Sequence, residues 1–273
     1  MIWILLAVVL AVWIWLKYIR PLSHFTRLGV KQSNHPWPFF GDQWRMIFRY
    51  MSVGEVALMI YNLCQKCRYV GFYQFTVPTL IVKDPELIKQ ITVKDFDHFT
   101  DYRQFVDPDS DPIWAGNLFS LTGSVDTCLG PSMRPPVVMM DRICTKPYTI
   151  EPKYPDEKPI SLNVGDMFML PMFGLHRDPK YFPNPEKFDP ERFSDEEKGK
   201  IVPYSYIPFG SGPRNCIGSR FAILEAKALL YYLLLNFQIV PIKKTAIPLK
   251  LSKTTLQHTA EGGYWMGLKR IRE

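Results

Sequence analysis

A loop rich in glycine and carrying one cysteine, Pro208–Gly218, stands directly before a long apolar segment. That segment, Ile217–Phe237, is apolar on nearly all of its helical faces, so we expect one long and deeply buried helix there. The glycines would let backbone amides approach the sulfur of Cys216, and the helix dipole would favour negative charge on it. The pattern predicts that Cys216 is a thiolate able to bind a metal ion.

The N-terminus is an uncharged apolar run, Met1–Leu16, which Lys17 can extend to about residue 19 by reaching to the lipid headgroups. A helix of that length spans roughly 28 Å, close to the thickness of a thin bilayer. A cleaved signal peptide and a buried core helix are the alternatives. The residues that end the apolar run are bulky, however, whereas a cleavage site needs small residues. We expect a single anchor in the endoplasmic reticulum membrane, with the following basic residues keeping the body on the cytoplasmic face.

The composition is that of a globular chain: 273 residues, 47% hydrophobic, with 33 basic against 26 acidic residues. The excess of positive charge is spread along the sequence and is not gathered in a basic stripe with interleaved aromatic residues. The charge favours an acidic partner or anionic lipid without deciding between them, and nucleic acid is not expected as a partner.

Five cysteines form an odd set in a chain too large to need a disulfide framework, which favours a reduced location facing the cytosol. Two of them, Cys64 and Cys67, make a CxxC pair that redox or zinc chemistry could use. No second CxxC accompanies the pair, and it ends an apolar helical pattern. We favour simple packing of two small side chains, with both cysteines unpaired.

Periodicity predicts a helix near residues 54–67, two strands at Tyr69–Phe75 and Thr79–Val82, and a helix opened by Asp84-Pro85-Glu86. The second half is richer in proline. Short extended pieces are expected at Pro159–Leu162 and Met167–Pro171, and strands and turns after residue 240. The expected fold class is mainly α with small β-sheets (α+β).

The loop Pro208–Gly218 resembles the haem-ligand loop of cytochromes P450, including Phe209 and Arg214. A glycine turn with Cys216 as a mere packing residue is the plain alternative, which the length of the resemblance makes improbable. The segment Phe188–Phe193 is similar to the family's PERF segment, and residues 71–75 and 94–100 resemble insect microsomal members of the xenobiotic-metabolising type.

The resemblance implies haem b (iron protoporphyrin IX), with Cys216 on the iron and Phe209 and Gly218 beside the cofactor. Arg142 and Arg214 match positions at which the family pairs arginine with the haem propionates. It also implies oxidation of lipophilic small molecules with O2 and with electrons from NADPH, through NADPH–cytochrome P450 reductase and possibly cytochrome b5. Candidate substrate-pocket residues, for which core packing is an equal alternative, are Val137, Val138, Met139 and Leu256.

The chain departs from this family between two matching blocks, Met1–Gly123 and Met133–Glu273. The central helices that supply protons to bound oxygen are missing, and the ExxR motif expected before Met133 is broken, so no catalytic residue is assigned. Arg192 should have lost its partners, which costs roughly 3–5 kcal/mol when the charge stays buried. The expected divisions are an anchor (1–19), an N-terminal segment (20–123), an aberrant junction (124–132) and a haem-ligand segment (133–273). A catalytically inactive, membrane-anchored truncated variant, or a gene-model fragment, is therefore the second hypothesis.

Overall fold

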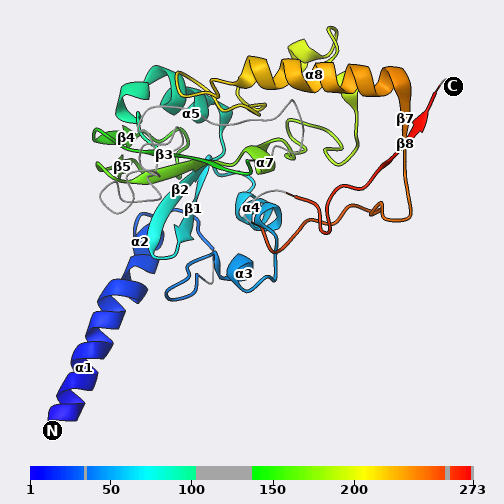
Figure 1. Cartoon of the computed structure of the whole chain (residues 1–273). Coiled ribbons are helices and arrows are strands. Elements are labelled where there is room, and N and C mark those ends of the chain that lie inside the picture. Colours follow the sequence, from blue (N-terminus) through cyan, green and yellow to red (C-terminus); the bar gives the residue numbers. More distant parts are fainter. Residues whose placement is uncertain (34–35, 103–136, 256–258, 272–273) are drawn as a thin grey trace.

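The computed structural model describes residues 1–33, 36–102, 137–255 and 259–271 (Figure 1). Helices surround one four-stranded sheet, and two further sheets have two strands each. This mixed helical and sheet architecture agrees with the expected fold class. The expected junction, residues 124–132, lies outside the described residues.

The N-terminal segment is a continuous helical rod that projects away from the body (Figure 1). None of the residues in its first part, α1, is buried. By length and composition, the helical stretch Ile2–Arg27 could cross a membrane. Its parts are α1 (Ile2–Ile14), a π-helical turn (Trp15–Ile19), a 3-10 turn (Arg20–Ser23) and α2 (His24–Arg27).

The main sheet joins strands from both halves of the sequence in the order β1-β2-β6-β3. Strands β1 and β2 form an antiparallel hairpin in which Tyr69 lies opposite Val82. Strand β2 then pairs in parallel with β6, and β6 pairs antiparallel with β3. The bounds are β1 (Tyr69–Gln74), β2 (Val77–Val82), β3 (Met140–Ile143) and β6 (Met167–Leu170).

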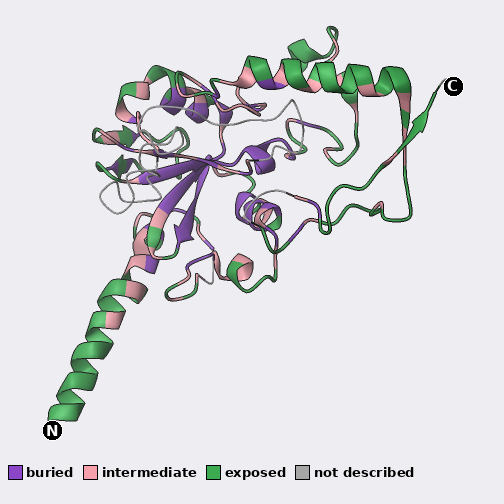
Figure 2. Ribbon diagram, in the orientation of Figure 1, coloured by how far each residue is buried: buried purple, intermediate pink, exposed green. Residues whose placement is uncertain are grey.

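Helices cover both faces of this sheet, so β1 and β6 are buried along their whole length (Figure 2). Helix α4 (Val53–Tyr61) packs against one face, where Phe72 and Ile81 point. Helix α5 (Pro85–Lys89) belongs to the core on the other face, with Leu80. The alternation of the two sets along β1 and β2 follows from the two-residue period of a strand.

Local capping explains where these two helices begin. The Ser52 hydroxyl accepts from the Glu55 backbone N–H at 3.3 Å, and the Glu55 carboxylate accepts from the Ser52 N–H at 2.7 Å. Before α5, the Asp84 carboxylate accepts from the Leu87 N–H at 2.9 Å, and Pro85 takes the first helical position. The expected strand pair and the helix after Asp84 are confirmed, whereas α4 ends at Tyr61, short of the expected residue 67.

The remaining elements are short and connect the sheet to the C-terminal helix. Helical pieces are α3 (Trp44–Ile47), α7 (Met172–Leu175), a π-helical turn (Gln90–Lys94) and 3-10 turns at Phe96–His98, Pro190–Phe193 and Lys198–Lys200. Strands β4 (Tyr148–Ile150) and β5 (Ile160–Leu162) form one small sheet, and β7 (Phe237–Val240) and β8 (Gly267–Arg270) the other.

Helix α8 (Ser219–Asn236) forms where the apolar segment predicted it, but the expectation that it is deeply buried is wrong. Ala222 is its one buried residue, while Phe221 and Leu224 are 70% and 66% exposed (Figure 2). Among the described helices and strands, β7 has the largest contact with α8, and it continues directly from the C-terminus of that helix. Burial requires a partner surface as well as an apolar sequence, and the described residues offer little to this helix.

The two cysteines after α4 are joined by a disulfide, so the expectation of two unpaired, packed side chains is wrong. The turn between Cys64 and Cys67 holds their Cα atoms 5.4 Å apart, a spacing that a disulfide can bridge. Among the described residues, Cys144 and Cys216 are the free cysteines, and both are buried.

Candidate functional site

The loop before α8 folds back on itself so that its cysteine lies inside. The backbone N–H of Cys216 donates to the Phe209 carbonyl at 2.8 Å, and that of Asn215 donates to the Gly212 carbonyl at 3.0 Å. Gly210 and Gly212 have φ values of 76° and 77°, a region that glycine adopts without strain. The backbone thus forms a closed turn around a side chain that is 2% exposed.

The loop is held against the π-helical turn Gln90–Lys94 from the N-terminal half of the chain. A Cβ atom added to Gly212 would lie 1.8 Å from the Thr92 carbonyl oxygen, so only glycine permits this approach. The hydroxyls of Thr92 and Ser211 lie 3.2 Å apart across the same contact. Sequence reasoning did not single out Thr92, because no local pattern distinguishes a threonine that a distant loop will contact.

Gly218, unlike Gly212, has open surroundings. It is the N-cap of α8, its φ of −84° is accessible to any residue, and an added Cβ atom would meet nothing within 4 Å. Its carbonyl accepts from the Ala222 N–H at 2.8 Å, the first bond of the helix. The glycine therefore leaves open space at the N-terminus of the helix, where partial positive charge accumulates.

The structure brings Arg142 and Arg214 together. Strand β3 carries Arg142, whose side chain is 2% exposed and whose Nη2 donates to the Arg214 carbonyl oxygen at 3.0 Å. The Tyr102 hydroxyl donates to the same carbonyl oxygen at 2.6 Å, and the Arg142 guanidinium stacks 4.1 Å from the centre of the Tyr102 ring. The role of Tyr102 was not anticipated, because Arg142 and Arg214, which it contacts here, are distant in sequence.

The Arg214 side chain has one hydrogen-bond donor without an acceptor among the described residues. Its Nε is buried and has no hydrogen-bond partner among the described residues. A buried guanidinium nitrogen with no acceptor costs free energy, which an anionic group placed beside it would recover. Arg214 stands two residues before Cys216, so such an anion would lie close to the thiol.

The candidate substrate-pocket residues pack in the core. Val138 is buried with Ala57 and Phe173 in one apolar cluster, and Val137 and Met139 pack against the neighbouring clusters. Leu256 lies outside the described residues. The pocket assignment remains a prediction, although the packing alternative accounts for the three described side chains.

Arg192, expected to be without its family partners, lies in the 3-10 turn Pro190–Phe193 and is partly exposed. Its Nη2 donates to the Asn184 carbonyl at 2.9 Å. Its Nε is buried without a partner in the described part of the chain, and so is the Tyr206 hydroxyl, whose ring stacks 4.8 Å from that of Phe193. These two buried donors therefore lack acceptors among the described residues.

The ligand set around Cys216 fits a metalloporphyrin better than a bare metal ion. Among the described residues, His, Cys, Asp and Glu side chains nowhere gather in groups of three or more that could enclose an ion. A planar group that supplies its own metal and carries acidic substituents would need a sulfur ligand and a cationic donor, which Cys216 and the buried Nε of Arg214 could provide. Cys216 is therefore a candidate axial ligand for a haem.

Comparison with known proteins gives the family. Residues 133–265 match the sequence profile of the cytochrome P450 family. Cytochrome P450 9e2 from Blattella germanica is 48% identical over 147 residues, which are 53% of this chain and 27% of that protein. Probable cytochrome P450 9f2 from Drosophila melanogaster is 52% identical over 134 residues, 49% of this chain and 25% of that protein. Cytochrome P450 3A13 from Mus musculus is 58% identical over 92 residues, 34% of this chain and 18% of that protein.

The match identifies residues 133–265 as cytochrome P450 sequence of the insect type, and that family implies a haem cofactor. The matched stretch spans only about a quarter of the length of the insect relatives. The loop Pro208–Gly218 falls inside it.

Proposed function

We propose that this chain is a haem-thiolate monooxygenase of the cytochrome P450 type, with haem b on Cys216. The observation that carries the proposal is the closed turn that buries Cys216 at the start of α8, next to Arg142 and Arg214. When bound, a haem with a thiolate axial ligand supplies the oxygen-activating chemistry of a monooxygenase. The substrates proposed are lipophilic small molecules, either xenobiotics or endogenous compounds.

Phe209, Arg214 and Cys216 of the loop have separate roles in this proposal. The Phe209 carbonyl fixes the Cys216 backbone, so the sulfur is presented in one orientation. The N-terminus of α8 adds partial positive charge at this end of the loop. The buried Nε of Arg214, which has no acceptor among the described residues, would bind one haem propionate. Arg142 positions the Arg214 backbone.

The proposed setting is the cytoplasmic face of the endoplasmic reticulum membrane, with residues 1–19 as the anchor. The support is the helical stretch Ile2–Arg27, whose first part α1 has no buried residue, and the basic residues that follow its apolar part. Electrons would come from NADPH through NADPH–cytochrome P450 reductase, with cytochrome b5 as a possible second donor. Residues 20–123 and 133–273 would form the two blocks of the body.

A second candidate is a truncated cytochrome P450 variant without enzyme activity. Specific observations favour it: α8 exposes its apolar side chains, and Arg192 and Tyr206 hold buried donors without partners in the described residues. These surfaces and donors belong to a fold that has lost packing partners. In this proposal the chain stays in the membrane and binds haem weakly or not at all.

A spectroscopic experiment separates the two. The full chain is purified in a neutral detergent with added haem, and the ferrous carbon monoxide difference spectrum is recorded. A thiolate-type Soret band that disappears in Cys216→Ser and persists in Cys144→Ser supports the haem site. Cys144 is the matched control because it is also buried and free.

Activity is tested separately, by NADPH consumption and product formation with added reductase and a lipophilic substrate. A thiolate band without turnover supports the inactive variant, whereas turnover overturns it. No retained haem rejects the monooxygenase proposal for this chain. Transcript sequencing across Gly123–Met133 then determines whether the junction is biological or an assembly error.

A further inference from the structure

A second concave site lies away from the Cys216 loop. A cavity of about 910 Å3 opens beside the disulfide, and no residue of Pro208–Gly218 lines it. Its walls come from the segment after α2, the end of α4 with the start of β1, the residues between β2 and α5, the loop between β4 and β5, and the turn after α7. The volume is in the range of small-molecule sites.

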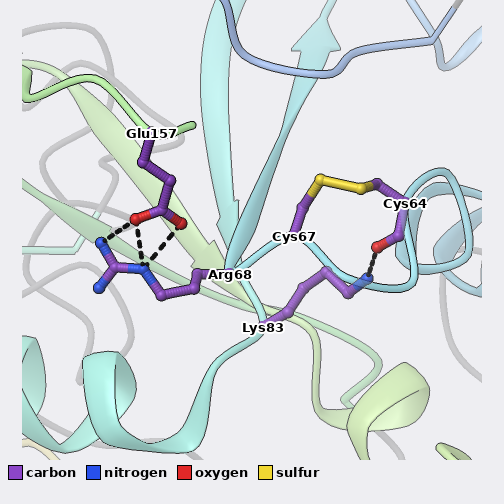
Figure 3. Close-up of a disulfide and its surroundings, with 5 residues drawn as sticks. All are labelled: Cys64, Cys67, Arg68, Lys83 and Glu157. Carbon is purple, nitrogen blue, oxygen red and sulfur yellow. Dashed lines mark hydrogen bonds and ion pairs between the residues drawn. A yellow bond between two sulfur atoms is a disulfide. The ribbon is translucent and has the colours of Figure 1, made fainter. Parts of the chain in front are cut away.

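Lys83 and Arg68 are buried cations that line this cavity, and Arg68 is paired with Glu157. The Lys83 side chain is 5% exposed, and its Nζ donates to the Cys64 carbonyl oxygen at 2.5 Å (Figure 3). The same Nζ lies 4.4 Å from the centre of the Tyr61 ring. An ammonium group has three N–H donors, and these two contacts do not use them all. Among the described residues, no carboxylate oxygen lies within 4 Å of it.

Three of the four acidic groups that line the cavity have other partners. Glu157 pairs with Arg68 at 2.9 Å, on the far side of the strand start from Lys83 (Figure 3). Asp178 accepts from the Tyr61 hydroxyl at 2.7 Å and from the Lys180 backbone N–H at 2.9 Å. Asp84 is 3.8 Å from the amino group of Lys153. None of these carboxylates directly neutralises Lys83.

The lining as a whole carries more positive than negative charge. Four acidic residues line the cavity, Asp84, Asp156, Glu157 and Asp178, against six basic ones, Lys31, Lys66, Arg68, Lys83, Lys158 and Lys180. An excess of cations around a concave surface attracts anions and raises their local concentration. A buried cation inside such a surface adds a defined binding point.

Aromatic rings supply the rest of the surface. Tyr61, Tyr69, Tyr154 and Tyr181 all line the cavity. Tyrosine rings give a flat ligand a large contact area through stacked or edge-on contacts. We propose that this cavity binds a small aromatic anion, with its acidic group on the Nζ of Lys83 and its ring among the tyrosines.

The protonation of Lys83 is tuned by its position. Burial lowers its pKa to about 8, a change that the negative charge of Asp178 opposes and the positive charge of Lys180 reinforces. An anion bound at Nζ would stabilise the charged form. Binding should therefore weaken as the pH rises from 7 through the pKa of Lys83, while exposed lysines are still charged.

The test uses the full chain in neutral detergent and two fluorinated probes of nearly equal size. Fluorine NMR titration should show saturable binding of 4-fluorobenzoate and much weaker binding of the neutral 4-fluorobenzamide. Lys83→Met should lower the affinity for 4-fluorobenzoate about tenfold or more, since a charge-assisted hydrogen bond is lost. Lys66→Met, at an exposed lysine of the same cavity, should change it less than about threefold.

Two further arms keep the proposal testable if Lys83→Met does not fold, which circular dichroism would reveal. Lys83→Arg retains the charge and should keep most of the affinity. In the unmodified chain, affinity for 4-fluorobenzoate should fall at least tenfold between pH 7 and about pH 9.5, where the probe remains an anion. Equal binding of the two probes, or affinity that is unchanged by Lys83→Met or by this rise in pH, overturns the proposal.

Discussion

Arg142 on β3 donates from its Nη2 to the backbone carbonyl oxygen of Arg214, two residues before Cys216, at 3.0 Å. The bond ties the cysteine loop to the central sheet. It depends on the Arg142 side chain and on the Arg214 backbone, so the two arginines have separable roles. Arg142 positions the loop, while the Nε of Arg214 is a buried donor that has no acceptor among the described residues.

Replacing Arg142 with Met should therefore destabilise the fold and loosen the loop together. The change removes hydrogen bonds to two backbone carbonyls and the stacking on Tyr102, which should lower the free energy of unfolding by about 1–3 kcal/mol. Urea denaturation measures the loss. Arg220→Met, at an exposed arginine of α8, is the control and should change stability by less than about 0.5 kcal/mol.

Replacement by alanine should change the stability of the chain strongly at one glycine of the loop and hardly at all at another. Gly212→Ala would push a methyl group into the Thr92 carbonyl at a φ of 77°, so we expect a loss of more than about 2 kcal/mol in thermal or urea unfolding. Gly218→Ala meets open space and should leave the stability of the chain nearly unchanged. If Gly218 faces haem, its alanine variant should still reduce haem retention, and unaltered retention would remove Gly218 from the proposed cofactor site.

The Cys64–Cys67 bridge closes a very short loop and should contribute about 2 kcal/mol by the chain-entropy estimate. Dithiothreitol should lower the midpoint of unfolding of the unmodified chain. The double variant Cys64→Ala/Cys67→Ala should start at the lower midpoint and show no further response to the reductant. Peptide mapping under non-reducing conditions checks the bridge itself, and two free thiols at these positions in the native chain would contradict it.

The buried pair of Arg68 and Glu157 should make stability depend on pH. Burial by itself would raise the pKa of Glu157, but hydrogen bonds from Arg68 and from the Lys153 backbone outweigh it and hold the pKa below its usual value of 4.5. The stabilisation is fully present above pH 4.5 and is lost as the pH falls through the lower folded-state pKa. Urea unfolding followed from pH 7 down to about pH 3 should show this loss in the unmodified chain.

The matching variant is Glu157→Gln. It should be less stable than the unmodified chain at pH 7, with the difference shrinking below pH 4.5. Glu196→Gln, at an exposed acid outside all described ion pairs, provides the baseline. A difference that stays constant over this pH range would show that the pair does not titrate as described.

Local patterns in the sequence predict local structure well in this chain. Alternation along residues 69–82 predicts the β1–β2 hairpin, and Asp84 with Pro85 predicts the start of α5, because a single strand or turn encodes each of these features. The loop motif likewise identifies Cys216 before any contact is known. These features depend on neighbours within a few residues.

The features that sequence could not predict depend on distant contacts. The Cys64–Cys67 bridge requires the Cα spacing of one particular turn, and the Arg142–Arg214 bond requires β3 to lie beside the loop. The exposure of α8 could not be read from its composition, since an apolar helix is buried only when another surface covers it. The cavity at Lys83 combines segments from five parts of the chain.

The parallel pairing of β2 with β6 joins strands from the two blocks on either side of the undescribed stretch 103–136. The Tyr61–Asp178 and Arg68–Glu157 contacts cross between the same blocks. The covalent connection between residues 102 and 137 is therefore not what holds the two parts together. Two polypeptides ending and beginning on either side of that stretch, produced in the same cell, should assemble into one complex without a peptide bond between them.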